Sequence, residues 1–474
     1  MIMSSNVHSP NDLKQMQSLP LKAKERMSMQ RLEVWYQSWC RYEIENLDTG
    51  KIRYTTFDRR DEFAKPPMKE NEVINSIIDG QVYVGFSGGK DSTVVADLAA
   101  RVCQANGWTL YLLFVNTGLE YPEIQKFVKT YAEWLRNTYE IEVVLDIVRP
   151  KMRFDEVIKR YGYPVISKSV SNTIAGARNS INKGEYSLRL RLLGVTEDEY
   201  GGLTYKGKHD YEKAAEGSKF EHTKYRYLLD ADFNSSDMCC DVMKKTPAKE
   251  YAKRTGRKPI LGTMAHESML REKDWIKHGC NAFEKKNPSS QPISFWTNQD
   301  ILHYLKKHNI PYCSVYGDIQ VKPQEDALEG QIDLIDYLGE YEAEDTLVTT
   351  GCDRTGCIFC MFGCHLEKEP NRFQRLKGTH PRQYEYCIGG GGYVYKAFKR
   401  DENGKWQEFD MAWEYDNGTP MTKQEIERFV QVHSVGFVGQ KEEDLWIKFE
   451  KHWQPNKQGL GLGYVLDYIG VKYE

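Results

Sequence analysis

Six consecutive residues have the side chains and the spacing of a phosphate-binding loop. They are Ser87, Gly88, Gly89, Lys90, Asp91 and Ser92. Adjacent glycines let backbone N–H groups approach phosphate oxygens closely, while the serines add hydroxyl donors and the lysine adds a cation. The aspartate disfavours a bare phosphate, so we expect it to be a partner of Mg²⁺ or an acid at a helix start. The GxxxxGK[ST] pattern of a Walker loop is absent, and a plain glycine turn with an N-cap serine explains fewer of the six residues.

Strands and helices alternate around this loop. The apolar stretch 81–86 (QVYVGF) predicts a strand that ends at the loop, and residues 93–105 predict the helix that follows. A second strand at 109–115, a helix at 122–139 and a third strand at 142–148 come next. This order predicts an α/β fold built on a doubly wound parallel sheet. In such sheets ligands bind at the carboxyl ends of the strands, which is where the loop lies.

The cysteines form two groups. Six of the eleven are Cys239 and Cys240, then Cys352, Cys357, Cys360 and Cys364. In a reducing compartment such groups indicate metal binding or redox chemistry more than structural disulfides. The later four lie within thirteen residues, at spacings that suit an iron–sulfur cluster or a structural Zn²⁺ ion.

The loop resembles the signature of PP-loop ATP pyrophosphatases, which cleave ATP between the α and β phosphates. The resemblance implies the adenine nucleotide alpha hydrolase-like variant of the fold, with ATP and Mg²⁺ at the loop. The end of the second strand resembles the second nucleotide element of that class. Its expected nucleotide-binding residues are Asn116, Thr117 and Gly118.

Further segments resemble the phosphoadenosine phosphosulfate reductase-like family, and the adenylylsulfate reductases in particular. That resemblance implies a [4Fe–4S] cluster on Cys239, Cys240, Cys357 and Cys360, with Lys244 completing a Cys-Cys-x-x-x-Lys motif. The alternative set for Zn²⁺ is Cys352, Cys357, Cys360 and Cys364. Residues 262–271 resemble a Gly-x-Arg-x-x-Glu-Ser-x-x-Arg segment, which implies roles for Glu267, Ser268 and Arg271. Met264 stands where that segment has its first arginine.

Two features argue against a sulfonucleotide reductase. The phosphate loop is complete, and no cysteine follows Cys387. The segment Arg354-Thr355-Gly356-Cys357 instead resembles the DndC family of ATP pyrophosphatases in bacterial DNA phosphorothioation. We therefore expect cleavage of ATP to AMP and pyrophosphate, which adenylylates a substrate for sulfur transfer, with a sulfur donor such as a cysteine desulfurase as partner. The expected catalytic residues are Lys90, Asp91, Lys244 and Arg271. The alternatives are an adenylylsulfate or phosphoadenylylsulfate reductase and a non-catalytic nucleotide-sensing subunit.

The chain of 474 residues is predicted to contain four parts. They are a helical N-terminal extension at 1–70, a PP-loop ATP-binding domain at 71–320 with a basic insertion at 149–230, an acidic segment and cysteine-rich region at 321–388, and a hairpin with a helical C-terminal region at 389–474.

Charge and apolar content guide the expected partners and location. Residues 149–191 hold ten Lys or Arg and three acidic residues, so their net charge is +7, whereas the whole chain has −3. This segment predicts contact with a nucleic acid, DNA or RNA, or else merely a solvated surface. There is no signal-peptide pattern and no run of 18 apolar residues, so we expect a cytoplasmic protein without a membrane partner.

Overall fold

The structure is a computed structural model. It describes residues 7–61, 63, 65–195, 222–322, 345–389, 391–401, 404–409, 411–414, 419–433, 447–455 and 460–474. The acidic stretch and residues 196–221 of the basic insertion therefore lie outside the described residues. The chain forms two compact units, Met1–Phe154 with Cys240–Ile358, and Asp155–Cys239 with Phe359–Glu474. The predicted boundaries at residues 70, 320 and 388 stay predictions.

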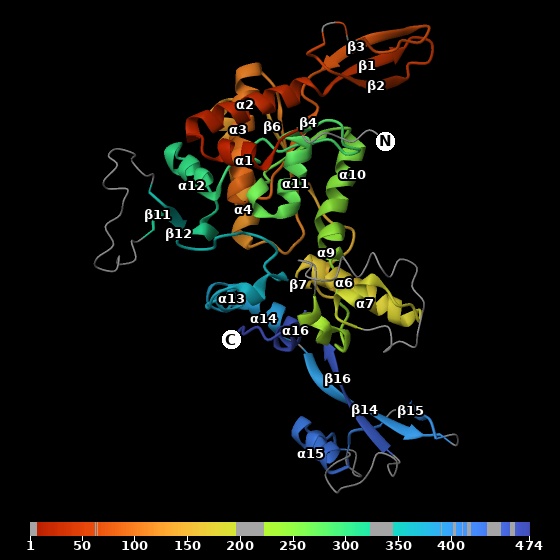
Figure 1. Cartoon of the computed structure of the whole chain (residues 1–474). Coiled ribbons are helices and arrows are strands. Elements are labelled where there is room, and N and C mark those ends of the chain that lie inside the picture. Colours follow the sequence, from red (N-terminus) through yellow and green to blue (C-terminus); the bar gives the residue numbers. More distant parts are fainter. Residues whose placement is uncertain are drawn as a thin grey trace, which may run out of the picture. The chain divides into compact units, whose positions relative to one another are not determined.

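A six-stranded sheet forms the centre of the first unit (Figure 1). Its strand order is β6-β5-β4-β8-β10-β9, and every neighbouring pair is parallel except β10 and β9. The bounds are β4 Val82–Gly85, β5 Leu110–Val115, β6 Val143–Val148, β8 Lys258–Leu261, β9 Asn281–Ala282 and β10 Ser289–Ser290. The predicted α/β fold is thus confirmed as a mixed α/β unit with a mostly parallel central sheet.

Helices α3 (Lys90–Asn106) and α4 (Pro122–Tyr139) follow β4 and β5, as the alternation predicts. Nearly all the valines and alanines of α3 are buried, because this helix packs against β4, β5, α4 and α12 (Asn298–Lys307). Helix α10 (Thr246–Thr255) packs against β5 and β6. These contacts fix the start of α3 at the end of β4, where the phosphate loop lies.

The N-terminal region, predicted as a helical extension over 1–70, begins with two helices and continues as strands. Helices α1 (Pro10–Gln17) and α2 (Leu21–Gln37) lead into the antiparallel sheet β2-β1-β3. Its strands are β1 Cys40–Asn46, β2 Ile52–Phe57 and β3 Glu72–Ile78. Buried residues alternate along β1, at Cys40, Tyr42 and Ile44, and this period of two belongs to a strand.

The remaining elements of the first unit connect these layers. They are the π-helical turn η3 (Asp241–Lys245), η4 (Ala265–Glu267), α11 (Met269–His278), η5 (Ser314–Tyr316), β11 (Ile319–Val321) and β12 (Leu347–Thr349). The short helix α9 (Met238–Cys240) contains the peptide bond at which the chain passes from one unit to the other.

The second unit combines short helices with a small sheet. Its elements before residue 240 are α5 (Phe154–Tyr161, whose first residue belongs to the first unit), β7 (Val165–Ile166), α6 (Lys168–Asn182), α7 (Leu188–Leu192) and η2 (Thr223–Leu229). Those after residue 358 are β13 (Met361–Phe362), η6 (Cys364–Leu366), α13 (Arg372–Thr379), α14 (Pro381–Ile388), β14 (Gly391–Arg400), β15 (Trp406–Phe409), α15 (Lys423–His433), β16 (Ile447–Pro455) and α16 (Leu462–Tyr468). The expected hairpin is β14–β15. The expected helical tail instead contains β16, which pairs with β14 over nine positions.

Candidate functional site

The phosphate loop joins β4 to α3 in a conformation that requires glycine. Gly88 has φ +74°, and a Cβ atom there would lie 2.9 Å from Ile124 Cγ2 and 3.0 Å from Val128 Cγ2. Ser87 Oγ lies 3.1 Å from Ser92 Oγ and accepts a hydrogen bond from the Gly89 N–H. The loop is therefore held by its own serines, and α3 begins at Lys90 directly behind it.

A polar cavity of ≈ 320 Å³ opens on this loop. The loop, the end of β8 and three later segments supply its walls. The lining residues are Gly85, Ser87, Gly89, Lys90, Asp91, Ser92, Leu261, Gly262, Thr263, Glu267, Tyr316, Arg354 and Thr355. A helix N-terminus and a lysine facing one cavity form an environment that suits an anion.

Lys90 and Asp91 bring opposite charges to this cavity. Lys90 is only 8% exposed, and its Nζ donates to the Asp353 carbonyl at 3.0 Å and lies 3.8 Å from Asp91 Oδ1. Asp91 Oδ1 is buried and has no hydrogen-bond partner. Burial raises the pKa of Asp91, although Lys90, Arg354 and Arg271 act in the opposite direction. An unpartnered carboxylate oxygen in a phosphate cavity fits a Mg²⁺ ligand.

Glu267 gathers two arginines beside the loop. It accepts from the Met264 N–H at 3.1 Å, pairs with Arg271 one helical turn along, and lies 3.2 Å from Arg354 Nη2. Ser268 is the N-cap of α11, because its Oγ accepts from the Arg271 N–H at 3.4 Å. Of this predicted group Glu267 lines the cavity, whereas Ser268 holds the helix that carries Arg271.

The loop after β5 is held internally. Asn116 Oδ1 accepts from the Gly118 N–H at 3.0 Å, and Thr117 Oγ1 donates to Glu120 Oε1 at 2.6 Å. None of these three predicted residues lines the polar cavity or the apolar cavity described next. Glu120, which the sequence analysis does not single out, does line the apolar cavity.

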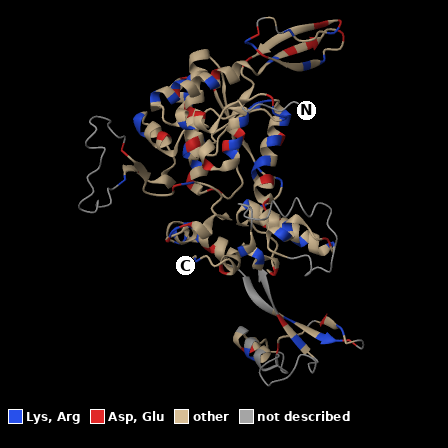
Figure 2. Ribbon diagram, in the orientation of Figure 1, with Lys and Arg blue, Asp and Glu red and all other residues tan. Residues whose placement is uncertain are grey.

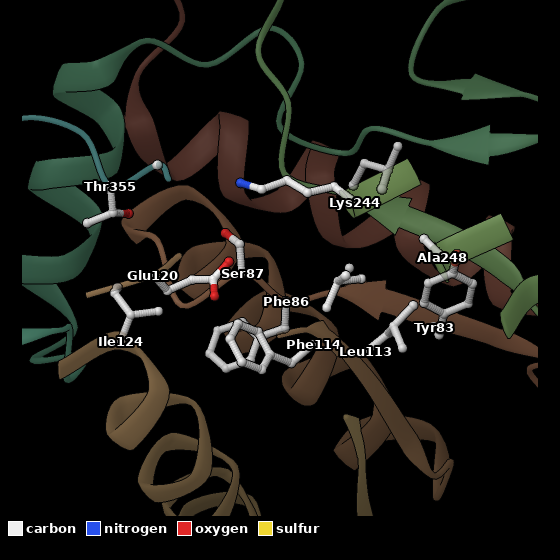
Figure 3. Close-up of a pocket in the computed structure, with 14 residues that line it drawn as sticks. Tyr83, Phe86, Ser87, Leu113, Phe114, Glu120, Ile124, Lys244, Ala248 and Thr355 are labelled. Carbon is white, nitrogen blue, oxygen red and sulfur yellow. The ribbon is translucent and has the colours of Figure 1, made fainter. Parts of the chain in front are cut away.

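An apolar cavity of ≈ 200 Å³ adjoins the polar one (Figure 3). Its lining residues are Tyr83, Gly85, Phe86, Ser87, Leu113, Phe114, Val115, Glu120, Ile124, Lys244, Ala248, Leu261, Thr355 and Gly356. The amino end of Lys244 points to the side of the cavity where Ser87 and Thr355 lie. Burial lowers the pKa of Lys244, but the charges of Cys357 and Glu120 and a hydrogen bond to Cys357 outweigh burial, so the net shift of the pKa is upward.

The four cysteines of the expected cluster are divided between the two units. Cys240 and Cys357 belong to the first unit, while Cys239 and Cys360 belong to the second. Among the residues that the structure describes, no group of three or more His, Cys, Asp or Glu is placed to hold a metal ion. The expected cluster and the zinc alternative each draw their cysteines from both units, and both stay predictions of the sequence.

Cys364 is an inert thiol rather than a reactive one. Its side chain is buried in the second unit and donates to the Met361 carbonyl at 3.0 Å. Burial raises its pKa to about 12. Cys352, in the first unit, donates to the Tyr121 hydroxyl at 3.7 Å.

Several residues of the site escaped sequence reasoning. Tyr316 is buried, accepts from the Lys90 N–H at 3.1 Å and lies 2.6 Å from Thr355 Oγ1. Thr263 Oγ1 is buried in the polar cavity without a hydrogen-bond partner. Arg354 had a signal in the motif before Cys357. Thr263 lies in the segment 262–271 at a position that the motif leaves open, and Tyr316 had no signal because it reaches the loop only through the fold.

Lys and Arg residues occur along the helices of the second unit (Figure 2), and two of the arginines make contacts within that unit. Arg178 is half-buried and donates to the carbonyls of Leu228 at 2.8 Å and Phe233 at 2.6 Å, so it holds the fold of the insertion. Arg189 is exposed but donates to Asn172 Oδ1 at 3.1 Å, and its side chain lies across Gly176. These arginines have a structural use that the charge count does not reveal.

Comparison with known families fits this geometry. A sequence model of the phosphoadenosine phosphosulfate reductase domain matches residues 81–183 and 190–362, which is more than half of the chain. The chain therefore belongs to this family, whose members are usually enzymes. A search of curated proteins finds no match. Within the described ranges, no helix is long and apolar enough to cross a membrane.

Proposed function

We propose that this protein is a cytoplasmic ATP-dependent enzyme that cleaves ATP to AMP and pyrophosphate and so activates a substrate oxygen for sulfur transfer. The observation that carries the proposal is the pair of adjoining cavities. One is polar and is lined by residues of the phosphate loop, and the other is apolar. A nucleotide needs this combination, because its base favours apolar walls and its phosphates favour N–H groups and cations.

Residues common to the two cavities support a position for the reacting phosphate. Gly85, Ser87, Leu261 and Thr355 line both, so the α-phosphate of a bound ATP would lie near Ser87. Lys90 and Arg271 would stabilise the negative charge that develops as the bond between the α-phosphorus and the pyrophosphate oxygen breaks. Lys244 reaches the same boundary from the apolar side, where it would orient the attacking oxygen.

The proposed chemistry is balanced as follows. The substrate hydroxyl oxygen forms a bond to the α-phosphorus, its proton passes to solvent, and pyrophosphate leaves. A persulfide donor then attacks the activated carbon, AMP leaves, and two electrons from a thiol reductant release the carrier. When bound, Mg²⁺ would be held by Asp91 and would neutralise phosphate charge. No step here depends on an iron–sulfur cluster.

The test is to incubate the purified protein with ATP and Mg²⁺ and measure AMP and pyrophosphate, with and without candidate acceptors. Release of orthophosphate and ADP, or no turnover with any acceptor although ATP binds, contradicts the proposal. The second of these results favours the nucleotide-sensing alternative. Sulfite formed from adenylylsulfate would favour the reductase alternative.

We further propose that the acceptor is a nucleic acid. The support is the exposed charge of the insertion within the second unit, where Lys159, Arg160, Lys168 and Lys183 are all exposed. Titration of DNA and RNA at two salt concentrations tests this, because phosphate contacts weaken steeply as salt rises. The double reversal Lys159→Glu and Lys183→Glu should lower binding, whereas Lys22→Glu on α2 should not. Absence of binding at low salt rejects a nucleic acid acceptor.

A further inference from the structure

Two arginines share one carboxylate beside the polar cavity. Lys90 lies 3.8 Å from Asp91, so these two charges are paired. Glu267, in contrast, pairs with both Arg271 and Arg354. One carboxylate therefore serves two guanidinium groups.

Arg354 is the more exposed of the two arginines that pair with Glu267. Its side chain is 64% exposed, and Glu267 is 14% exposed. Its contact with Glu267 is a single pairing at 3.2 Å, whereas Arg271 is partly buried on α11 and already neutralises the same carboxylate. Arg354 can therefore leave Glu267 without exposing an unpaired buried charge.

The loop that carries Arg354 is fixed against the phosphate loop on both sides of it. The Asp353 carbonyl accepts from Lys90 Nζ at 3.0 Å, and Thr355 Oγ1 lies 2.6 Å from the Tyr316 hydroxyl. Gly89 lies against Thr355, since a Cβ atom at that glycine would be 3.1 Å from Thr355 Oγ1. The backbone of Arg354 is therefore held at the cavity while its side chain stays exposed.

The polar cavity is also lined by two residues with a buried oxygen that has no hydrogen-bond partner. Asp91 Oδ1 and Thr263 Oγ1 are both buried without hydrogen-bond partners. A carboxylate and a hydroxyl together suit a phosphate with a bound cation, since the cation takes the carboxylate oxygen and the phosphate accepts from the hydroxyl.

We propose that Arg354 binds the outer phosphates of the nucleotide and makes the site selective for a polyphosphate. This deepens the proposed function and rests on it. Arg354 lines the polar cavity but not the apolar one, whereas Ser87 and Thr355 line both. Arg354 thus lies beyond the point where the α-phosphate would sit. Planar guanidinium groups pair with phosphate oxygens in bidentate geometry, so lysine is a poor substitute.

Calorimetric titration of the full-length protein with Mg-ATP, AMP and pyrophosphate tests the proposal. Arg354→Ala should weaken binding of ATP and of pyrophosphate by about 10- to 100-fold, the range for hydrogen bonds to charged groups. Binding of AMP should change by less than about twofold, since AMP lacks the outer phosphates. The affinity of Arg354→Lys for ATP and pyrophosphate should lie between those of the wild type and Arg354→Ala. Arg26 is an exposed arginine on α2, and Arg26→Ala should bind all three ligands as the wild type does.

The outcomes separate this proposal from the proposed function. Equal weakening of AMP and ATP by Arg354→Ala, or no weakening of either polyphosphate, overturns the role of Arg354 and leaves the proposed function intact. Selective loss of pyrophosphate affinity supports the role of Arg354 even if ATP is not hydrolysed. Wild-type protein that binds neither ATP nor pyrophosphate overturns both proposals. Thermal unfolding of each variant confirms that it is folded.

Discussion

Replacing Asp91 with asparagine should stabilise the protein that has no ligand bound while impairing its use of Mg-ATP. Asp91 lies in the first turn of α3, with Oδ1 buried and unpartnered. Burial disfavours the carboxylate more than Lys90, Arg354 and Arg271 favour it, and its pKa is raised as a result. The charged form of Asp91 is therefore a net cost to the folded state, which a bound cation would remove.

The size of the effect follows from the unpartnered oxygen. A buried polar atom without a partner costs about 1–3 kcal/mol, and an amide in its place recovers part of that cost because it is neutral. We expect Asp91→Asn to raise the free energy of unfolding by about 1 kcal/mol near pH 8. A gain of that size raises the unfolding temperature of a unit of this length by about 2 °C.

The effect has a defined pH dependence. A carboxyl group with a raised pKa keeps its proton to higher pH in the folded state, so its cost is absent below the unfolded value of 3.8. The cost grows as pH rises through the folded pKa and is complete above it. The difference between variant and wild type should therefore be near zero at pH 3.5 and increase toward pH 8.

Asp97 on the same helix is the matched control. It is fully buried and accepts from Tyr139 Oη and Tyr304 Oη at 2.5 Å each and from Arg101 Nε at 2.9 Å. Asp97→Asn should lower the free energy of unfolding by about 3 kcal/mol, because it breaks a buried charged network. Urea denaturation of both variants from pH 3.5 to 8 gives the comparison. If Asp91→Asn destabilises the protein as Asp97→Asn does, the reasoning about Asp91 is refuted.

Three further predictions concern the phosphate loop, a buried ion pair and a buried cysteine. Gly88→Ala should cost about 2 kcal/mol in urea denaturation and abolish ATP binding, because alanine is strained at φ +74° and would contact Ile124; unchanged stability would contradict this. Lys24→Met should cost about 3–5 kcal/mol, since it leaves the buried Asp300 carboxylate without its cation at 2.7 Å, and adding Asp300→Asn should restore part of the loss. Cys364 should resist iodoacetamide at pH 8 in the folded protein, because its raised pKa of about 12 leaves almost no thiolate; rapid labelling detected by mass spectrometry would show that the thiol is accessible and ionised.

Local patterns predicted the core of the fold well. The predicted helix at 122–139 has the bounds of α4, and the strands at 109–115 and 142–148 differ from β5 and β6 by one residue at one end. Each is a long apolar or amphipathic run, whose period identifies the element directly. In contrast, strand β1 was not distinguished from the helix before it. Only Ser38 and Trp39 separate it from α2, and its seven residues are too few to tell a strand period of two from a helix period of 3.6.

The candidate site divides in the same way. The residues of the phosphate loop and Glu267 carried strong sequence signals, and the structure brings them to one cavity. Tyr316 reaches that cavity from a segment without a motif, and Thr263 stands at a position that its motif leaves open, so no local pattern could single them out. Arg178 was counted as part of the basic charge of the insertion, but it donates to the carbonyls of Phe233, Leu228 and Ala231. A charge count cannot distinguish such an arginine from a solvated one.

The loop before Cys357 joins the phosphate loop to a cysteine within the first unit. The Ile358 N–H donates to the Leu119 carbonyl at 2.8 Å, and the Gly351 N–H donates to the Tyr316 carbonyl at 2.8 Å, so both ends of the loop are anchored. Lys90 holds its middle through Asp353. A phosphate bound at the loop would compete with that carbonyl for Lys90, and so would change a contact four residues from Cys357. Under the proposed function such a link would be useful, since sulfur transfer before adenylylation would find no leaving group.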